Sequence, residues 1–365
     1  MFNRRRFLAN TIAATGMLAD SLSIASAEAF TEAAKLIITG FRGTTTSDPE
    51  VRSILRYLEA DQIAGVLLLK RNIVSPEQVL KLSLAFREAS ARVPIIAIDQ
   101  EGGSIARLDA SNGFSDWMSA AEMSSSDMTD EEIFEYYLVR AREMMSVGIN
   151  LNFGPVLDLN VNPLNPIIGM FGRSFGKTSA TVVRLASTFV QVHRAVGIMT
   201  CAKHFPGHGS SVSDSHLAVT DINSTWSEEE LRPFREMSSL GNLDCLMTSH
   251  VILRRFSDDG TRPVSLSRKG VDAARTELGY SGPIVTDDLQ MRAITSGFTQ
   301  EAAAVAAVNA GHTFLVYANY GDEFTIDTAA AVQGALRAAL STGDLELSTL
   351  VEQQNVASLF LDRLR

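Results

Sequence analysis

The sequence predicts an α/β protein folded as a single (β/α)8 barrel of the TIM type. Eight short apolar segments, several of them rich in isoleucine and valine, alternate with longer stretches that carry helix signals. Near-continuous apolarity over a few residues is typical of a parallel strand covered on both faces, and eight such strands alternating with helices are typical of this barrel. The expected strands are Leu36–Thr39, Gly65–Leu69, Pro94–Ile98, Ile149–Phe153, Ile198–Ala202, Cys245–Thr248, Ile284–Thr286 and Thr313–Tyr317.

Helix starts are predicted in the stretches between these strands. Asp48 and Pro49 supply an N-cap residue and a proline for the first turn of a helix. A doubly wound open sheet is the competing fold, but no G-x-G-x-x-G motif follows the first predicted strand, which favours the barrel. The capping-box pattern, a serine or threonine three residues before a glutamate or glutamine, occurs at Ser75 and Gln78, Thr129 and Glu132, and Ser227 and Glu230.

The first 27 residues are expected to form a twin-arginine export signal. The basic run Arg4–Arg6 precedes an apolar, small-residue segment at Ala9–Ala19, and Ala25–Ala27 fits an A-x-A cleavage site. A short first helix with a basic start is the alternative interpretation. The export signal leaves residues 28–365 as one barrel domain and predicts an exported protein, with the periplasm as the expected compartment.

Composition excludes several classes of partner. The net charge of −10 disfavours nucleic acid, because phosphates favour a clustered basic surface. After the N-terminus no apolar stretch reaches the roughly 18 residues of a membrane span, so no integral membrane span is expected. Cys201 and Cys245 both lie in apolar segments, and we expect two buried thiols on strands rather than a disulfide, although an exported protein would permit one. The sequence carries no signal for a particular oligomeric state.

Ionisable residues follow several of the predicted strands. The third strand is followed by D-Q-E-G-G at residues 99–103, and the fifth by K-H-F-P-G-H-G at residues 203–209. In a barrel these strand ends meet on one face, where active sites lie. Groups of both charge signs therefore converge there, and the candidates are Asp99, Arg107, Arg173, Lys203, His204, Asp214, His216 and Asp287.

The histidines also permit a metal interpretation. His204, His208, Asp214 and His216 have side chains of the metal-ligand type, and His250 follows the next strand. However, a proline and two glycines lie near or between His204 and His208, and they break the helix that two ligands four residues apart would need. We therefore expect no metal and no other cofactor, and we expect His208 to stabilise its loop by hydrogen bonding.

These motifs, in this order, resemble glycoside hydrolase family 3, and most closely its bacterial β-N-acetylhexosaminidase branch. The K-H-F-P-G-H-G run followed by D-S-H at residues 214–216 is the specific part, supported by D-Q-E-G-G, whereas T-D-D-L at residues 286–289 is weak alone. The similarity extends over nearly all of the chain after the leader. It implies a (β/α)8 barrel and an O-glycosyl hydrolase that acts on a carbohydrate without a cofactor.

The resemblance also implies roles for the candidate residues. Asp287 matches the family's nucleophile, on which a covalent glycosyl-enzyme forms. Asp214 and His216 match a dyad in which the aspartate orients the histidine, and the histidine replaces the usual second carboxylic acid as general acid and base. Contacts with sugar hydroxyls and with the N-acetyl group are implied for Asp99, Arg107, Arg173, Lys203 and His204.

Some positions depart from the family pattern. Ser104 stands where many relatives have an arginine, so we expect a structural salt bridge to be lost and the sugar contact of Arg107 to survive. The segment that ends at Arg173 looks slightly longer than in many relatives, which puts the placement of Arg173 in doubt. His312 lies in a segment where an acidic residue would be expected, so substrate contacts from the last strand are in doubt. Glu101 could instead bond backbone amides at the following glycine turn.

The expected function is release of terminal, non-reducing β-linked N-acetylglucosamine from peptidoglycan-derived or chitin-like fragments by double displacement. A β-glucosidase-type glycosidase of the same family is an alternative, but such relatives tend to take their acid/base carboxylate from an additional domain, whereas this chain has Asp214 and His216. A non-catalytic wall-sugar binding protein is a further alternative, but binding alone does not need both Asp287 and His216. A metal-dependent hydrolase is the third alternative, and transfer to phosphate rather than to water also stays open.

Overall fold

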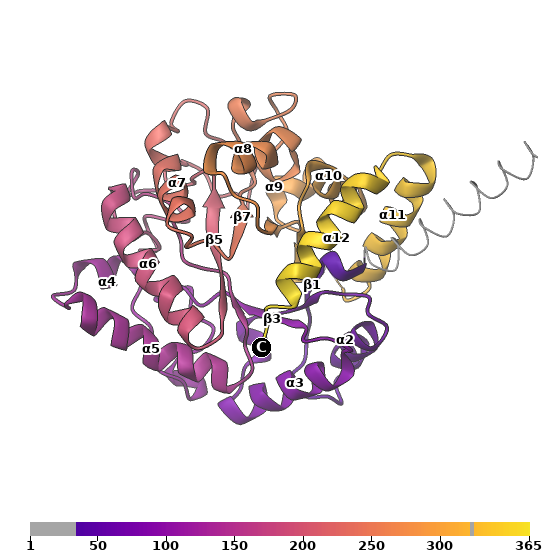
Figure 1. Ribbon diagram of the computed structural model, residues 1–365, viewed down its shortest axis with the longest axis horizontal. Helices are drawn as coiled ribbons and strands as arrows, with labels where there is room; N and C mark the ends of the chain where they lie inside the picture. The colour runs from indigo at the N-terminus through magenta and orange to yellow at the C-terminus, as the bar shows by residue number, and fades with distance from the viewer. Residues whose placement is uncertain (1–33, 322–324) are drawn as a thin grey trace, which may run out of the picture.

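The computed structural model describes residues 34–321 and 325–365 and confirms the predicted barrel (Figure 1). Eight parallel strands pair in chain order, and the last strand pairs with the first to close the barrel. Each overlaps a segment expected to be a strand. The strands are β1 (Ile37–Gly40), β2 (Gly65–Leu68), β3 (Ile95–Ile98), β4 (Leu151–Asn152), β5 (Met199–Phe205), β7 (Cys245–Thr248), β9 (Ile284–Asp288) and β10 (Phe314–Tyr317).

Helices lie around the outside of the strands (Figure 1). No helix among the described residues is long and apolar enough to cross a membrane. The expected export signal at residues 1–27 lies outside the described residues. The helices are α2 (Pro49–Glu59), α3 (Pro76–Ala89), α4 (Ala120–Ser125), α5 (Asp130–Ser146), α6 (Ser179–Ala195), α7 (Arg232–Ser239), α8 (Arg268–Leu278), α9 (Arg292–Thr295), α10 (Gln300–Ala310), α11 (Thr328–Thr342) and α12 (Leu347–Leu361).

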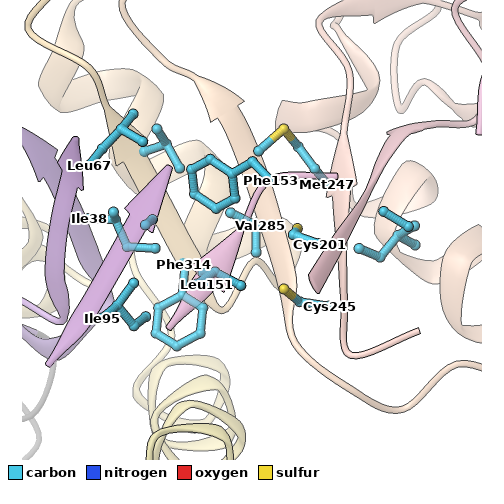
Figure 2. Close-up of a cluster of buried hydrophobic side chains, with 14 of the residues drawn as sticks. Ile38, Leu67, Ile95, Leu151, Phe153, Cys201, Cys245, Met247, Val285 and Phe314 are labelled. Carbon is cyan, nitrogen blue, oxygen red and sulfur yellow. The ribbon is translucent and has the colours of Figure 1, made fainter. Parts of the chain in front are cut away.

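Apolar side chains from the strands fill the barrel. Figure 2 shows Ile38, Leu67, Ile95, Val285 and Phe314 converging from different strands, and all five are buried. Near-complete burial on both faces is the reason these strands are apolar throughout rather than alternating.

The two cysteines belong to this core. Cys201 on β5 and Cys245 on β7 are partners in the strand register, and both are buried as free thiols. The expectation of two buried thiols is therefore confirmed. Burial raises the pKa of the Cys245 thiol, so this thiol stays protonated at neutral pH.

The predicted helix starts have mixed outcomes. At α5 the capping box is complete, since Thr129 Oγ1 accepts from the Glu132 amide and Glu132 accepts from the Thr129 amide. At α3 Ser75 caps as expected, but the side chain of Gln78 accepts from the amide of Val74. Helix α2 begins at Pro49 as predicted.

The capping box predicted at Ser227 and Glu230 is wrong. These residues begin a short 3-10 helix, η4 (Glu228–Leu231), and Ser227 makes no side-chain cap. Glu230 turns inward instead, because the loop after β5 presents a buried amide there: Glu230 Oε2 accepts from the Ser210 amide at 3.0 Å.

A second sheet of two short strands was not predicted. β6 (Thr220–Asp221) pairs with β8 (Val251–Ile252), so the loop after β5 is tied to the loop after β7. Asp214 and His216 lie on the first of these loops. The small sheet therefore fixes the far end of the loop that carries the predicted dyad.

Candidate active site

Asp287 lies near the carboxyl end of β9, where the predicted site should be. Burial raises the pKa of its carboxyl, but the positive charge that His250, His204 and His216 can carry outweighs burial, and the net shift is downward. The Asp288 amide also donates to Asp287 Oδ1 at 2.8 Å. Asp287 is therefore an anion at neutral pH with histidines around it.

The predicted sugar-binding residues form one ion network. Lys203 Nζ lies 2.8 Å from Asp99 Oδ1 and 2.7 Å from Glu101 Oε1. Arg173 makes a bidentate pair with Glu101, with both nitrogen–oxygen distances 2.8 Å. Arg107 Nη2 lies 3.4 Å from Asp99 Oδ2. The third strand, the fifth strand and the loop after β4 thus meet through their charged side chains.

Glu101 is the centre of this network, not a turn-stabilising residue. Burial raises the pKa of the Glu101 carboxyl, but Arg173 and Lys203 outweigh burial and lower it overall. Burial lowers the pKa values of Arg173 and Lys203, and the facing carboxylates raise both overall. All three groups are therefore charged at neutral pH. The interpretation of Glu101 as a partner of backbone amides is wrong, because both of its carboxylate oxygens are taken by Arg173 and Lys203.

Arg173 reaches the site despite the long segment before it. Asn165 folds that segment back: its Nδ2 donates to the carbonyl of His208 at 2.7 Å, and its Oδ1 accepts from the amides of Ile167 and Ile168. Arg173 Nη1 in turn donates to the carbonyl of Ile167 at 2.9 Å. The segment is thus a compact turn that aims Arg173 at the network.

Asp158 is a site residue that the sequence reasoning missed. It is fully buried after β4, and its Oδ2 lies 2.6 Å from His204 Nδ1. Its other oxygen accepts from the amide of His208 at 2.8 Å. Burial raises the pKa of Asp158, but His204 outweighs burial and lowers it overall. The available signal was an acidic residue inside the apolar stretch V-L-D-L at residues 156–159.

His204 therefore has two different neighbours. Asp158 holds Nδ1, and Nε2 lies 3.3 Å from Nη2 of Arg173. Because a guanidinium only donates, this geometry places the lone pair of a neutral ring on Nε2 and the proton on Nδ1. His204 thus connects the buried aspartate to the ion network.

His208 is a loop-stabilising residue, as expected. Its ring nitrogens contact the hydroxyls of Ser211 and Ser215. Burial lowers the pKa of His208 to about 4, so the ring is neutral in this position at pH 7. The ring therefore anchors the loop between β5 and the predicted dyad.

Asp214 and His216 contact each other in the predicted manner. Asp214 Oδ1 lies 2.8 Å from His216 Nδ1 and accepts from the His216 amide at 2.8 Å. This arrangement leaves Nε2 as the ring nitrogen that can exchange a proton with a substrate. The side chain of His216 is 57% exposed, which keeps it accessible.

The dyad loop is held against the segment that follows Asp287. The amide of Ala293 donates to the carbonyl of Ser215 at 3.2 Å, and the amide of Arg292 donates to the carbonyl of His216 at 3.4 Å. Helix α9 begins only five residues after Asp287. The backbone thus brings the dyad to the end of β9.

The remaining expectations concern His250, His312, Ser104 and a metal. His250 Nε2 lies 2.8 Å from the carbonyl of Asp288, and the ring borders Asp287. His312 is buried before β10, where it contacts Thr248 Oγ1 at 2.8 Å, so it has a core role away from the substrate.

Ser104 is exposed. Within residues 34–321 and 325–365, no group of three or more His, Cys, Asp or Glu side chains could hold a metal ion.

The comparisons with known proteins identify the family of this chain. The model for the glycosyl hydrolase family 3 N-terminal domain matches residues 40–356. The chain belongs to glycosyl hydrolase family 3. The resemblance stated from the motifs is therefore confirmed, and so is the expected enzyme class, a glycosyl hydrolase.

Two bacterial β-hexosaminidases are similar to most of the chain. A β-hexosaminidase of Tolumonas auensis is 36% identical over 280 residues, which are 74% of this chain and 79% of the relative. A β-hexosaminidase of Idiomarina loihiensis is 33% identical over 285 residues, 76% of this chain and 81% of the relative.

Solved structures of the family have the same fold. A family 3 β-N-acetylglucosaminidase from Paenibacillus superposes with a TM-score of 0.81 at 31% identity, over 91% of this chain and 62% of that one. This chain thus spans about three fifths of that larger protein. A β-N-acetylhexosaminidase from Beutenbergia cavernae gives a TM-score of 0.79 at 25% identity, over 92% of this chain and 98% of that one.

Proposed function

We propose that this protein is a retaining β-N-acetylhexosaminidase that releases terminal, non-reducing β-linked N-acetylglucosamine. The observation that carries the proposal is the surroundings of Asp287: an ionised carboxylate bordered by histidines, one of which, His216, is paired with Asp214 on a loop held against α9. The names of the family 3 relatives support the choice of sugar.

The first displacement forms a glycosyl ester. Protonated His216 gives its Nε2 proton to the glycosidic oxygen as the bond from that oxygen to the anomeric carbon breaks. The Asp287 carboxylate attacks the same carbon from the opposite face and forms the ester. Asp214 stabilises the cationic ring before transfer and holds the neutral ring in the tautomer that can act next.

The second displacement reverses these roles. Neutral His216 takes a proton from a water molecule, and the resulting oxygen attacks the anomeric carbon while the bond to Asp287 breaks. The product is N-acetylglucosamine with retained configuration. His216 ends the cycle protonated and Asp287 ends it as a free carboxylate, so no cofactor is consumed.

The ion network would hold the sugar that is cleaved. Asp99 and Arg107 are its more exposed members, with 18% and 24% of their side chains exposed, and they are the groups positioned to contact hydroxyls. Glu101, Lys203 and Arg173 are more deeply buried. We propose that these three groups hold Asp99 and His204 in position and bind the N-acetyl group. They take no part in proton transfer.

Paired chromogenic substrates test this function. We expect cleavage of 4-nitrophenyl β-N-acetylglucosaminide and much slower cleavage of the β-glucoside. Asp287→Ala and His216→Ala should each lower kcat/KM on the first substrate. Full activity of Asp287→Ala would contradict the mechanism, and a preference for the glucoside would contradict the substrate. Sugar binding without any turnover would favour the wall-sugar binding protein.

A further inference from the structure

Large apolar side chains are exposed in two segments beside the candidate active site. Of the sixteen such side chains among the described residues, seven lie in residues 160–172 and 211–219. Single exposed apolar residues are ordinary, whereas a cluster marks a binding surface. Five of the seven, which we call the apolar rim, are at least half exposed: Leu164, Met170, Phe171, Val212 and Leu217.

The two segments of the apolar rim contact each other. Asn162 Nδ2 donates to the carbonyl of Ser211 at 3.0 Å, and Asn165 Nδ2 donates to the carbonyl of Gly209 at 3.1 Å. Leu164 lies between these two asparagines, and Val212 directly follows Ser211. These hydrogen bonds hold the two segments that carry the apolar rim next to each other.

The apolar rim borders the proposed acid/base. Leu217 directly follows His216, and its amide donates to the carbonyl of Asp214 at 3.0 Å. On the other segment, Phe171 is two residues before Arg173 in the same compact turn. His216 is the group proposed to protonate the departing oxygen. In the proposed mechanism the part of the substrate beside His216 is the leaving group, so the apolar rim next to His216 is the candidate subsite for that group.

The two segments also carry few charged residues. Residues 159–172 contain no Asp, Glu, Lys, Arg or His, although 20% of the chain is charged. Residues 205–219 contain only Asp214, His208 and His216 as ionisable groups. Apart from His216, these two segments offer no cation to an anionic leaving group, which would lose hydration here at a cost. A pyranose presents an apolar face of C–H groups that fits exposed apolar side chains.

We propose that the apolar rim is the leaving-group subsite and that it selects an uncharged pyranose, such as the next N-acetylglucosamine of a chitin-like oligosaccharide, over an anionic muramic acid. This inference rests on the proposed function and narrows the choice between its two substrate classes. It concerns only the leaving group, which departs with the proton from His216.

Three substrates distinguish recognition of the cleaved sugar from recognition of the leaving group. β-N-acetylglucosaminyl fluoride tests the cleaved sugar, because its leaving group is too small to contact the apolar rim. N,N′-diacetylchitobiose carries a neutral leaving group, and the disaccharide of N-acetylglucosamine and N-acetylmuramic acid carries an anionic one. We expect wild-type protein to have a higher kcat/KM for chitobiose than for the anionic disaccharide.

Substitutions in the rim should change ratios of kcat/KM. Leu164→Ser combined with Phe171→Ser should lower the ratio of chitobiose to fluoride about fivefold, because apolar contact with the leaving group is lost. Leu164→Lys should raise the ratio of anionic to neutral disaccharide. Leu359→Ser, at a similarly exposed leucine on α12, is the matched control and should leave both ratios unchanged.

The outcomes distinguish a failure of this inference from a failure of the proposed function on which it rests. If wild-type protein cleaves the fluoride but prefers the anionic disaccharide, or if the rim variants leave the ratios at the control value, the inference is overturned and the proposed function stands. If wild-type protein cleaves none of the three substrates, the proposed function is overturned and the inference with it.

Discussion

Two neighbouring aspartates at the end of β9 are both buried, but their pKa values are shifted in opposite directions. The histidines around Asp287 hold its pKa below the ordinary range. At Asp288 burial dominates and raises the pKa to about 7, although its Oδ1 accepts from the amides of Gln290 and Ala318. Environments that separate two adjacent pKa values are typical of catalytic sites. The geometry therefore gives the negative charge to the carboxylate that we propose as nucleophile.

A third carboxyl group, Glu230, provides a prediction at the residue scale. Burial raises its pKa to about 7 from an ordinary value near 4.5. Because the folded-state pKa is raised, the cost of ionising Glu230 in the folded protein is absent below about pH 4.5 and complete above about pH 7. Glu230→Gln cannot ionise and can still accept from the Ser210 amide. The variant should therefore be more stable than wild type at pH 8, by about 1–3 kcal/mol, and close to it at pH 4.5.

Urea unfolding at several pH values measures this difference. The free energy of unfolding of the variant minus that of wild type should grow as the pH rises from about 4.5 to 7. Glu229→Gln is the matched control, because Glu229 is exposed and its change should not follow this pH dependence. A difference between Glu230→Gln and wild type that stays constant across the range would contradict the buried, titrating carboxyl.

At the scale of elements, Glu101 joins three parts of the barrel. It follows β3 and pairs with Lys203 on β5 and with Arg173 from the loop after β4. Glu101→Gln would leave two buried cations with one carboxylate fewer. We expect a loss of about 2–4 kcal/mol in the free energy of unfolding, and a rise in KM because Lys203 and Arg173 lose their fixed positions.

Chemical denaturation and steady-state kinetics check this prediction together. An exposed pair supplies the control, since Glu236→Gln on α7 removes only a surface contact with Arg232 and should change stability by less than about 1 kcal/mol. A Glu101→Gln protein with the stability and KM of wild type would show that the network does not organise the site.

Much at this scale could be predicted from the sequence, and the misses have physical reasons. Short apolar runs determine strands locally, so all eight were found. Motif residues such as Lys203 and His216 were found because each lies in a short contiguous motif. Asp158 and Asn165 were missed because their partners lie on other loops and become neighbours only when the barrel closes. Glu230 was misinterpreted because a local capping pattern cannot reveal a long-range amide partner.

At the scale of the whole molecule, the barrel gathers loops from β3, β4, β5, β7 and β9 at one end, and the helices cover the outside (Figure 1). The predicted sugar-binding residues and the dyad come from different loops, so no single segment holds the site. The buried strand residues of Figure 2 form the core that holds the strand ends, and thus these loops, together. A complete site therefore requires the closed barrel.

Export is the prediction that concerns the molecule in its cell, and it stays a proposal. The basic run, the apolar segment and the A-x-A motif of residues 1–27 support it. Arg5→Lys with Arg6→Lys should leave the protein in the cytoplasm while wild type is found in the periplasm, by fractionation of expressing cells. Because lysine keeps the positive charge, this substitution tests the arginine pair itself rather than the charge. Equal periplasmic amounts of both proteins would contradict the twin-arginine interpretation.

The central claim is that Asp287 forms a bond with the sugar, and trapping that bond tests it most directly. A 5-fluoro β-N-acetylglucosaminyl fluoride has a good leaving group, while its ring fluorine slows breakdown of the ester. Mass spectrometry of the intact protein should show one added glycosyl group, and peptide mapping should place that group on Asp287. A label on another residue, or turnover of the fluoride by Asp287→Ala at the wild-type rate, would contradict the account.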